Sequence, residues 1–253
     1  MSFVHITERA GVVRVTLDRP PLNVIDLAMA RELSAAFTEV AAREHVSVVV
    51  LEARGGAFSA GVDVRDHLPD RGAEMLREFH RAGFALLEIG APTVAAVHAA
   101  ALGGGCELTL CCDLVVADAS ATFALPEIRL GVFPPLAAVA LPRMIPAHVA
   151  AELILTGRSL TAEQALRVGL VNRVAEPGAF DAAVENLITE LLALSPSSLR
   201  VTKRALRLAR AAPDPADVAT AERLYVEQLL NAPDAVEGLN AFMEKRAPAW
   251  RRS

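Results

Sequence analysis

Two glutamates stand in apolar stretches of the chain, 20 positions apart. Glu107 lies in GGGCELTL and Glu127 lies in ALPEIRLG. A carboxylate among apolar neighbours is costly unless it is paired or used. Burial raises the pKa of such a group toward the range in which it can transfer protons near neutral pH. The pair therefore predicts acid–base chemistry, although each glutamate also fits a first-turn residue that complements a helix dipole.

Two loops rich in small residues follow apolar, strand-like runs. The first is GGAFSAGVD, residues 55–63, and the second is the glycine triplet at residues 103–105, just before CELTLCC. A strand–glycine–helix junction leaves backbone N–H groups free, and the positive end of the helix dipole attracts negative charge. Two such N–H groups facing one point would form an oxyanion hole. Each loop also fits an ordinary βα turn, whereas neither carries a nucleotide-binding glycine pattern.

The elements that must position these groups alternate between strand and helix. Apolar runs at residues 12–18, 47–53, 93–99 and 113–118 predict strands. Asp26 is placed to begin a helix over residues 27–43, and helical patterns fill the chain from about residue 180. The sequence predicts an α/β body over residues 1–195 and a helical C-terminal region over residues 196–253.

Composition limits the class of protein. The chain has 253 residues, 53% of them apolar, and a net charge of −5. The charge argues against a nucleic-acid surface, and the apolar excess favours self-association. No apolar run is long enough to span a membrane, and no secretory signal opens the sequence. Cys106, Cys111 and Cys112 follow neither a disulfide nor a zinc pattern, so we expect buried thiols in the cytoplasm and no metal.

Several segments together resemble the crotonase (enoyl-CoA hydratase/isomerase) superfamily. They are LDRPPLNVID, AFSAGVD, ALGGGCEL, PEIRLG, LTGRSLTAEQALRVGLVNRV and FMEKRAP, in order along nearly the whole chain. The resemblance implies a ClpP/crotonase-like spiral of repeated ββα units with a helical C-terminal trimerisation region. It also implies trimers or hexamers, an acyl-CoA thioester substrate that carries the coenzyme itself, no separate cofactor, and a place in fatty acid metabolism.

The resemblance also assigns roles to individual residues. The N–H groups of Ala60 and Gly104 would form the oxyanion hole, and Glu107 and Glu127 would be the catalytic carboxyls. Asp63 would fix its loop, and Lys245 would approach the CoA nucleotide. The implied substrate-binding set is Leu22, Ala60, Gly61, Val62, Asp63, Gly104, Pro134 and Lys245.

The implied chemistry is addition of water to the C=C bond of an enoyl-CoA. Two N–H donors stabilise the enolate oxygen. In the hydration direction we expect Glu127 to protonate the α-carbon and Glu107 to help activate water. Three alternatives stay open: a hydratase of an acyclic or cyclic enoyl-CoA, an enoyl-CoA isomerase, and a non-catalytic acyl-CoA-binding protein. The presence of both glutamates favours hydration.

Two departures from the family pattern point to a particular branch. Pro135 stands where hydratases usually carry a glycine, and proline has no N–H with which to hold water. His98 lies in VHAA, where the commoner motif is Val-Asn-Gly-Tyr. Both features resemble enzymes that act on cyclic dienoyl-CoA thioesters, although His98 also fits a hydrogen-bonded structural imidazole.

Overall fold

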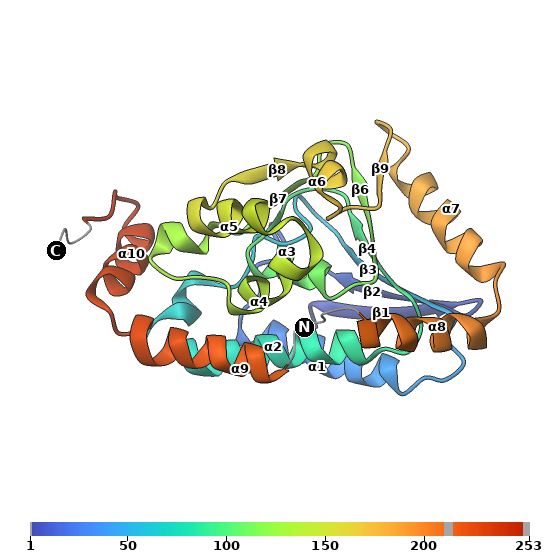
Figure 1. Ribbon diagram of the computed structural model, residues 1–253, viewed down its shortest axis with the longest axis horizontal. Helices are drawn as coiled ribbons and strands as arrows, with labels where there is room; N and C mark the ends of the chain where they lie inside the picture. Colours follow the sequence, from blue (N-terminus) through green and yellow to red (C-terminus); the bar gives the residue numbers. More distant parts are fainter. Residues whose placement is uncertain (1, 210–214, 250–253) are drawn as a thin grey trace.

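The computed structural model describes residues 2–209 and 215–249 (Figure 1). The strands are β1 (Val4–Arg9), β2 (Val12–Leu17), β3 (Val48–Ala53), β4 (Thr93–Val97), β5 (Ala101–Leu102), β6 (Leu114–Asp118), β7 (Thr122–Ala124), β8 (Ser159–Thr161) and β9 (Arg173–Ala175). The helices are α1 (Leu27–Ala41), η1 (Val64–His67), α2 (Gly72–Glu88), α3 (Gly104–Leu110), η2 (Pro126–Leu130), α4 (Pro135–Met144), α5 (Ala147–Thr156), α6 (Ala162–Val168), α7 (Phe180–Leu192), α8 (Pro196–Ala209), α9 (Pro215–Leu224), η3 (Tyr225–Leu229) and α10 (Pro233–Met243).

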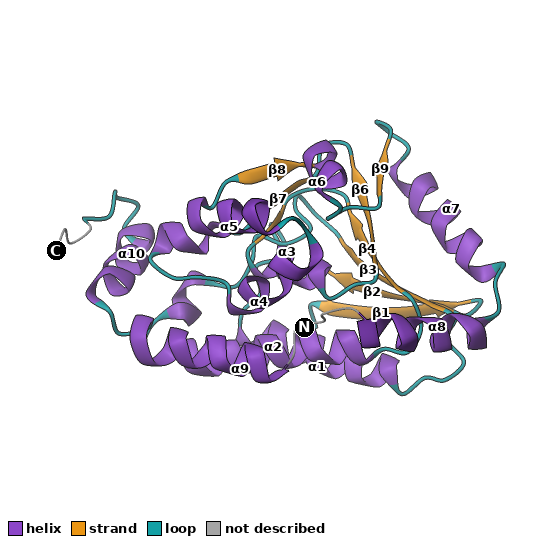
Figure 2. Cartoon of the chain, viewed as in Figure 1, coloured by secondary structure: helices purple, strands orange, loops and turns teal. Residues whose placement is uncertain are grey.

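A six-stranded sheet forms the centre of the molecule, in the order β1-β2-β3-β4-β6-β9 (Figure 2). Only the β1–β2 pair is antiparallel among these neighbours. Helix α7 covers one face, where Val184, Leu187 and Ile188 pack against valines of β3 and β4. The other face belongs to the larger core, which includes α1 and α2. Burial on both faces explains why the inner strands β3, β4 and β6 are almost continuously apolar.

A second sheet, in the order β5-β7-β8, positions the predicted chemistry. Strands β5 and β7 are parallel neighbours, with Ala101 opposite Phe123. The chain passes from β5 into α3, and from β7 into η2. Because the carboxyl ends of parallel strands meet at one edge, Glu107 in α3 and Glu127 in η2 are brought to the same place.

The predicted fold class is confirmed: the protein is a mixed α/β molecule whose last described part is helical. The strands predicted at residues 47–53, 93–99 and 113–118 are present as β3, β4 and β6. Short strands such as β5 and β9 were not predicted, because two or three residues carry no period. The predicted division after residue 195 falls between α7 and α8. It remains a prediction, and part of its second region lies outside the described residues.

Within residues 2–209 and 215–249, no helix is both long and apolar enough to cross a bilayer. The three cysteines are buried, as expected. Asp26 begins α1, its side chain accepting from the Met29 N–H.

Candidate active site

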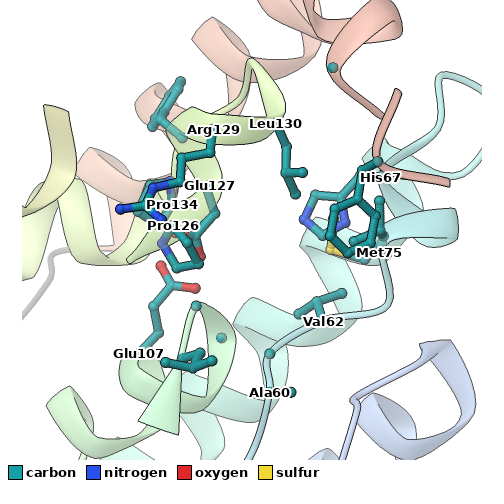
Figure 3. Close-up of a pocket in the computed structure, with 18 of the residues that line it drawn as sticks. Ala60, Val62, His67, Met75, Glu107, Pro126, Glu127, Arg129, Leu130 and Pro134 are labelled. Atoms are coloured by element: carbon teal, nitrogen blue, oxygen red, sulfur yellow. The ribbon is translucent and has the colours of Figure 1, made fainter. Parts of the chain in front are cut away.

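Both predicted carboxyls are buried, with Glu107 4% and Glu127 8% exposed. Figure 3 shows them turned toward each other on one side of a cavity. Glu107 Oε1 accepts a hydrogen bond from the Ala137 N–H at 2.8 Å. Glu127 Oε2 is buried without a hydrogen-bond partner among the described residues. The two acids therefore share one site but differ in how well their charged forms are stabilised.

Burial raises the pKa of both carboxyls. For Glu127, burial and then the charge of Glu107 raise the pKa to about 8. Burial also raises the pKa of Glu107, while His80 and the backbone N–H groups of Ala137 and Leu136 oppose that rise. Because two close carboxylates cannot both ionise at little cost, the pair holds a proton near neutral pH. This is the state that acid–base chemistry needs.

The loop of residues 57–63 is held on both sides by other backbone segments. The Ser59 carbonyl accepts from the Leu102 N–H at 2.9 Å. Further along, the Gly61 carbonyl accepts from the Ile25 N–H at 2.8 Å, and the Asp63 N–H donates to the Ile25 carbonyl at 2.8 Å. These bonds determine which N–H groups of the loop are already hydrogen-bonded within the protein and which remain free to bind a substrate.

The fixed loop corrects the predicted oxyanion donor. The Ala60 N–H already donates to the Leu22 carbonyl at 2.9 Å, so it is not available to a substrate. The Gly61 N–H donates to Ser59 Oγ at 3.1 Å. The next amide, that of Val62, has no acceptor among the described residues, and Val62 lines the cavity. The backbone hydrogen bonds thus leave Val62 as the free donor of this loop.

The glycine triplet and the loop approach each other closely. Gly104 is the first residue of α3, and its N–H has no acceptor in the described part of the chain. A side-chain Cβ at Gly104 would lie 2.8 Å from Val62 Cγ2, and one at Gly61 would lie 2.9 Å from the Leu102 carbonyl oxygen. Gly61 also has a φ of +94°, which favours glycine. Small residues therefore let two free amides stand side by side.

A cavity of about 480 Å³ opens in front of these groups. Figure 3 shows His67 and Met75 across the cavity from the two glutamates, with Val62 between. The other lining residues include Phe79, Leu130, Phe133, Pro134, Pro135, Tyr225, Phe242 and Arg246. The walls are mainly apolar, and the polar groups converge from a few points, as is typical of small-molecule sites.

Comparisons with known proteins agree with this geometry. The sequence profile described as Enoyl-CoA hydratase/isomerase matches residues 7–253. The cyclohexa-1,5-dienecarbonyl-CoA hydratase of Thauera aromatica is 38% identical over 245 residues, covering 96% of this chain and 94% of that protein. The carnitinyl-CoA dehydratase of Salmonella typhi is 32% identical, covering 98% of each chain.

The chain belongs to the enoyl-CoA hydratase/isomerase family.

Solved structures support the same family. The enoyl-CoA hydratase of Mycobacterium avium subsp. paratuberculosis K-10 matches with a TM-score of 0.87 at 28% identity, covering 99% of both chains. An enoyl-CoA hydratase/isomerase from Pseudoalteromonas atlantica T6c also has a TM-score of 0.87, at 29% identity, covering 98% of this chain and 100% of that one. The predicted resemblance to the superfamily is confirmed.

The structure brings only part of the predicted substrate-binding set to the cavity of this family member. Ala60, Gly61, Val62, Gly104 and Pro134 line it.

The other three predicted contacts lie elsewhere. The Leu22 side chain is partly exposed, and the Leu22 carbonyl accepts the hydrogen bond from the Ala60 N–H. The Asp63 carboxylate accepts from the Arg65 N–H at 2.9 Å, which agrees with its predicted loop-fixing role. Lys245 is exposed and adopts a φ of +54°, while its neighbour Arg246 lines the cavity. The contacts of Leu22, Asp63 and Lys245 with substrate remain predictions.

Several polar residues at or behind the cavity were not predicted. His67 lines it, donates from Nδ1 to the Asp63 carbonyl at 3.1 Å, and has its pKa lowered by burial. His80, whose charge opposes the rise in the Glu107 pKa, is buried and pairs through Nδ1 with Glu222 of α9. Tyr225 enters the cavity from a helix about 100 positions beyond both glutamates. No local motif marks these residues, since their neighbours come from distant elements.

His98 lies outside the cavity lining. Its Nε2 donates to the Gly55 carbonyl at 2.9 Å, so the structure gives it a structural hydrogen bond. The described residues contain no cluster of three or more His, Cys, Asp or Glu side chains able to hold a metal ion.

Proposed function

We propose that this protein is an enoyl-CoA hydratase, a hydro-lyase that adds water across the C=C bond of an α,β-unsaturated acyl-CoA. The observation that carries the proposal is the pair of buried carboxyls beside two free backbone amides, at a cavity of about 480 Å³. Family membership supports the CoA thioester as substrate, and the hydratase and dehydratase names of two relatives support the reaction.

The free amides act on the thioester carbonyl. As water attacks the β-carbon, negative charge develops on the carbonyl oxygen and an enolate forms. The N–H groups of Val62 and Gly104 donate to that oxygen. Such donors stabilise the developing charge most strongly in a pocket that excludes water. Because they are already in position, they do not have to reorient during the reaction.

The two carboxyls move the protons. The water oxygen bonds to the β-carbon while one water proton passes to one carboxylate, and the other carboxyl gives its proton to the α-carbon. The pair therefore ends with the same number of protons as it had at the start, shifted from one acid to the other. A later exchange with solvent restores the original arrangement.

The hydrogen bonds favour one division of labour. The Ala137 N–H stabilises charge on Glu107 at 2.8 Å, whereas Glu127 Oε2 has no donor among the described residues. Glu127, with its pKa raised to about 8, is then the protonated member and donates to the α-carbon. Glu107 is the carboxylate that takes the proton from water.

We expect a cyclic dienoyl-CoA to be the preferred substrate. The similarity to the Thauera aromatica enzyme spans 96% of this chain, and Pro135 lines the cavity at the place where the family pattern usually has glycine. The broad apolar walls of Met75, Phe79 and Leu130 suit a flat hydrocarbon ring better than an extended chain.

A spectrophotometric comparison tests the function. Cyclohexa-1,5-dienecarbonyl-CoA, crotonyl-CoA and a longer 2-enoyl-CoA are each mixed with the protein, and loss of the conjugated thioester absorbance is followed. We expect the fastest loss with the cyclic thioester, and a loss of rate in Glu127→Gln. Growth of that absorbance from a 3-enoyl-CoA, without loss from any 2-enoyl-CoA, would identify an isomerase instead.

A further inference from the structure

The hydroxyl of Tyr225 is a buried polar group without a partner. Tyr225 is 1% exposed, and its oxygen has no hydrogen-bond partner among the described residues. Leaving a buried hydroxyl unsatisfied destabilises a folded protein. The residue also lines the cavity, so a ligand or water in that space is the available partner. A buried hydroxyl that lacks a hydrogen-bond partner and lines a cavity calls for a functional explanation.

The backbone at Tyr225 is also unusual. Helix α9 ends at Leu224, and residues Tyr225–Leu229 form a π-helical turn, in which the Leu230 N–H donates to the Tyr225 carbonyl at 2.8 Å. Single π-turns are often found at functional sites. Phe133 packs against the tyrosine ring with the ring centroids 5.7 Å apart. The turn and this contact hold the ring in place at the cavity wall.

The chemical surroundings define what the hydroxyl can bind. Charges on Glu127 and Glu107 add to burial in raising the pKa of Tyr225, so the phenol stays protonated and acts as a donor. Pro135, which also lines the cavity, has no N–H to offer. A water molecule between two carboxyls can donate both of its hydrogens to them, and its oxygen then needs a donor from another direction.

We propose that the Tyr225 hydroxyl donates a hydrogen bond to the oxygen of the water that is added to the substrate, and to the same oxygen as the hydroxyl group of the product. This inference rests on the proposed hydratase function and adds a third catalytic group to Glu107 and Glu127. The tyrosine forms and breaks no covalent bond. It fixes the position of the attacking oxygen and compensates for the missing amide at Pro135.

Two reactions of one active site separate this role from simple packing. Hydration needs a positioned water, whereas exchange of the α-protons of a saturated acyl-CoA with D₂O needs only the carboxyls and the oxyanion donors. In Tyr225→Phe we expect kcat for hydration to fall on the order of 10-fold or more, with α-proton exchange nearly unchanged. The unfolding midpoint should stay close to that of the unmodified protein, because the variant keeps the aromatic ring that packs against Phe133.

A matched variant controls for packing of the helix. Val218 is buried on α9 but does not line the cavity, so Val218→Ala should lower the unfolding midpoint and leave both rates as they are. An unchanged hydration rate in Tyr225→Phe would overturn the inference, and so would an equal fall in both reactions. If the unmodified protein hydrates none of the enoyl-CoAs, the proposed function fails first, and this inference fails with it.

Discussion

Replacing Glu127 by glutamine should change how the stability of the protein depends on pH. The pKa of Glu127 is about 8 in the folded protein, against an ordinary value of 4.5. Between these values the folded state holds a proton that the unfolded state has lost, so stability falls as pH rises. The two values differ by about 3.5, and one pKa unit corresponds to about 1.4 kcal/mol, so the loss approaches about 5 kcal/mol near pH 8.

The assay is urea unfolding followed by circular dichroism, at a fixed protein concentration and at several pH values from about 5 to about 8. Near pH 5 the variant and the unmodified protein should have similar free energies of unfolding. Toward pH 8 the variant should become the more stable of the two by a few kcal/mol, since glutamine cannot ionise. The exposed Glu176 provides a control, and Glu176→Gln should follow the unmodified protein. Parallel stability profiles for Glu127→Gln and the unmodified protein would refute the reasoning.

Three further predictions concern the catalytic groups and the assembly. Glu107→Gln should reduce the rate of hydration by roughly 100-fold or more, while calorimetry should show that acyl-CoA binding is retained. Normal turnover in this variant would show that Glu107 takes no part in the reaction. Gly104→Ala places a Cβ 2.8 Å from Val62 Cγ2 and should lower kcat/KM by roughly 100-fold, whereas Gly56→Ala, whose nearest contact would be 3.7 Å, should be active. Sedimentation should give trimers or hexamers, because Leu192, Leu194, Val201 and Leu206 expose apolar surface on and beside the C-terminal helices; a stable monomer at micromolar concentration contradicts this.

The sequence predicted the two carboxyls because the signal for them is local. Glu107 and Glu127 each stand among apolar residues, which is unusual enough to be noticed without a structure. That they face each other depends on the pairing of β5 with β7, which are only two and three residues long. Strands this short have no periodic pattern, so the pairing itself could not be predicted.

The sequence could not identify the free amide of the first loop. Which N–H is available depends on the carbonyl of Leu22 and on Ile25, more than 30 positions earlier in the chain. Tyr225 was missed for a similar reason, since a tyrosine in a helix gives no sign of what its hydroxyl will meet. The contact of Lys245 with substrate rests on the family resemblance and remains a prediction; the structure shows an exposed Lys245 side chain beside Arg246, which lines the cavity.

The central claim, that buried carboxyls and free amides add water to an enoyl-CoA, is tested most directly by isotope incorporation. The protein is incubated with cyclohexa-1,5-dienecarbonyl-CoA in water enriched in oxygen-18, and the product is analysed by mass spectrometry. We predict a hydroxyacyl-CoA that carries one oxygen-18 atom, with incorporation abolished in the Glu107→Gln, Glu127→Gln double variant. Conversion to an unlabelled isomer of the same mass as the substrate, or equal labelling by the double variant, would contradict the account.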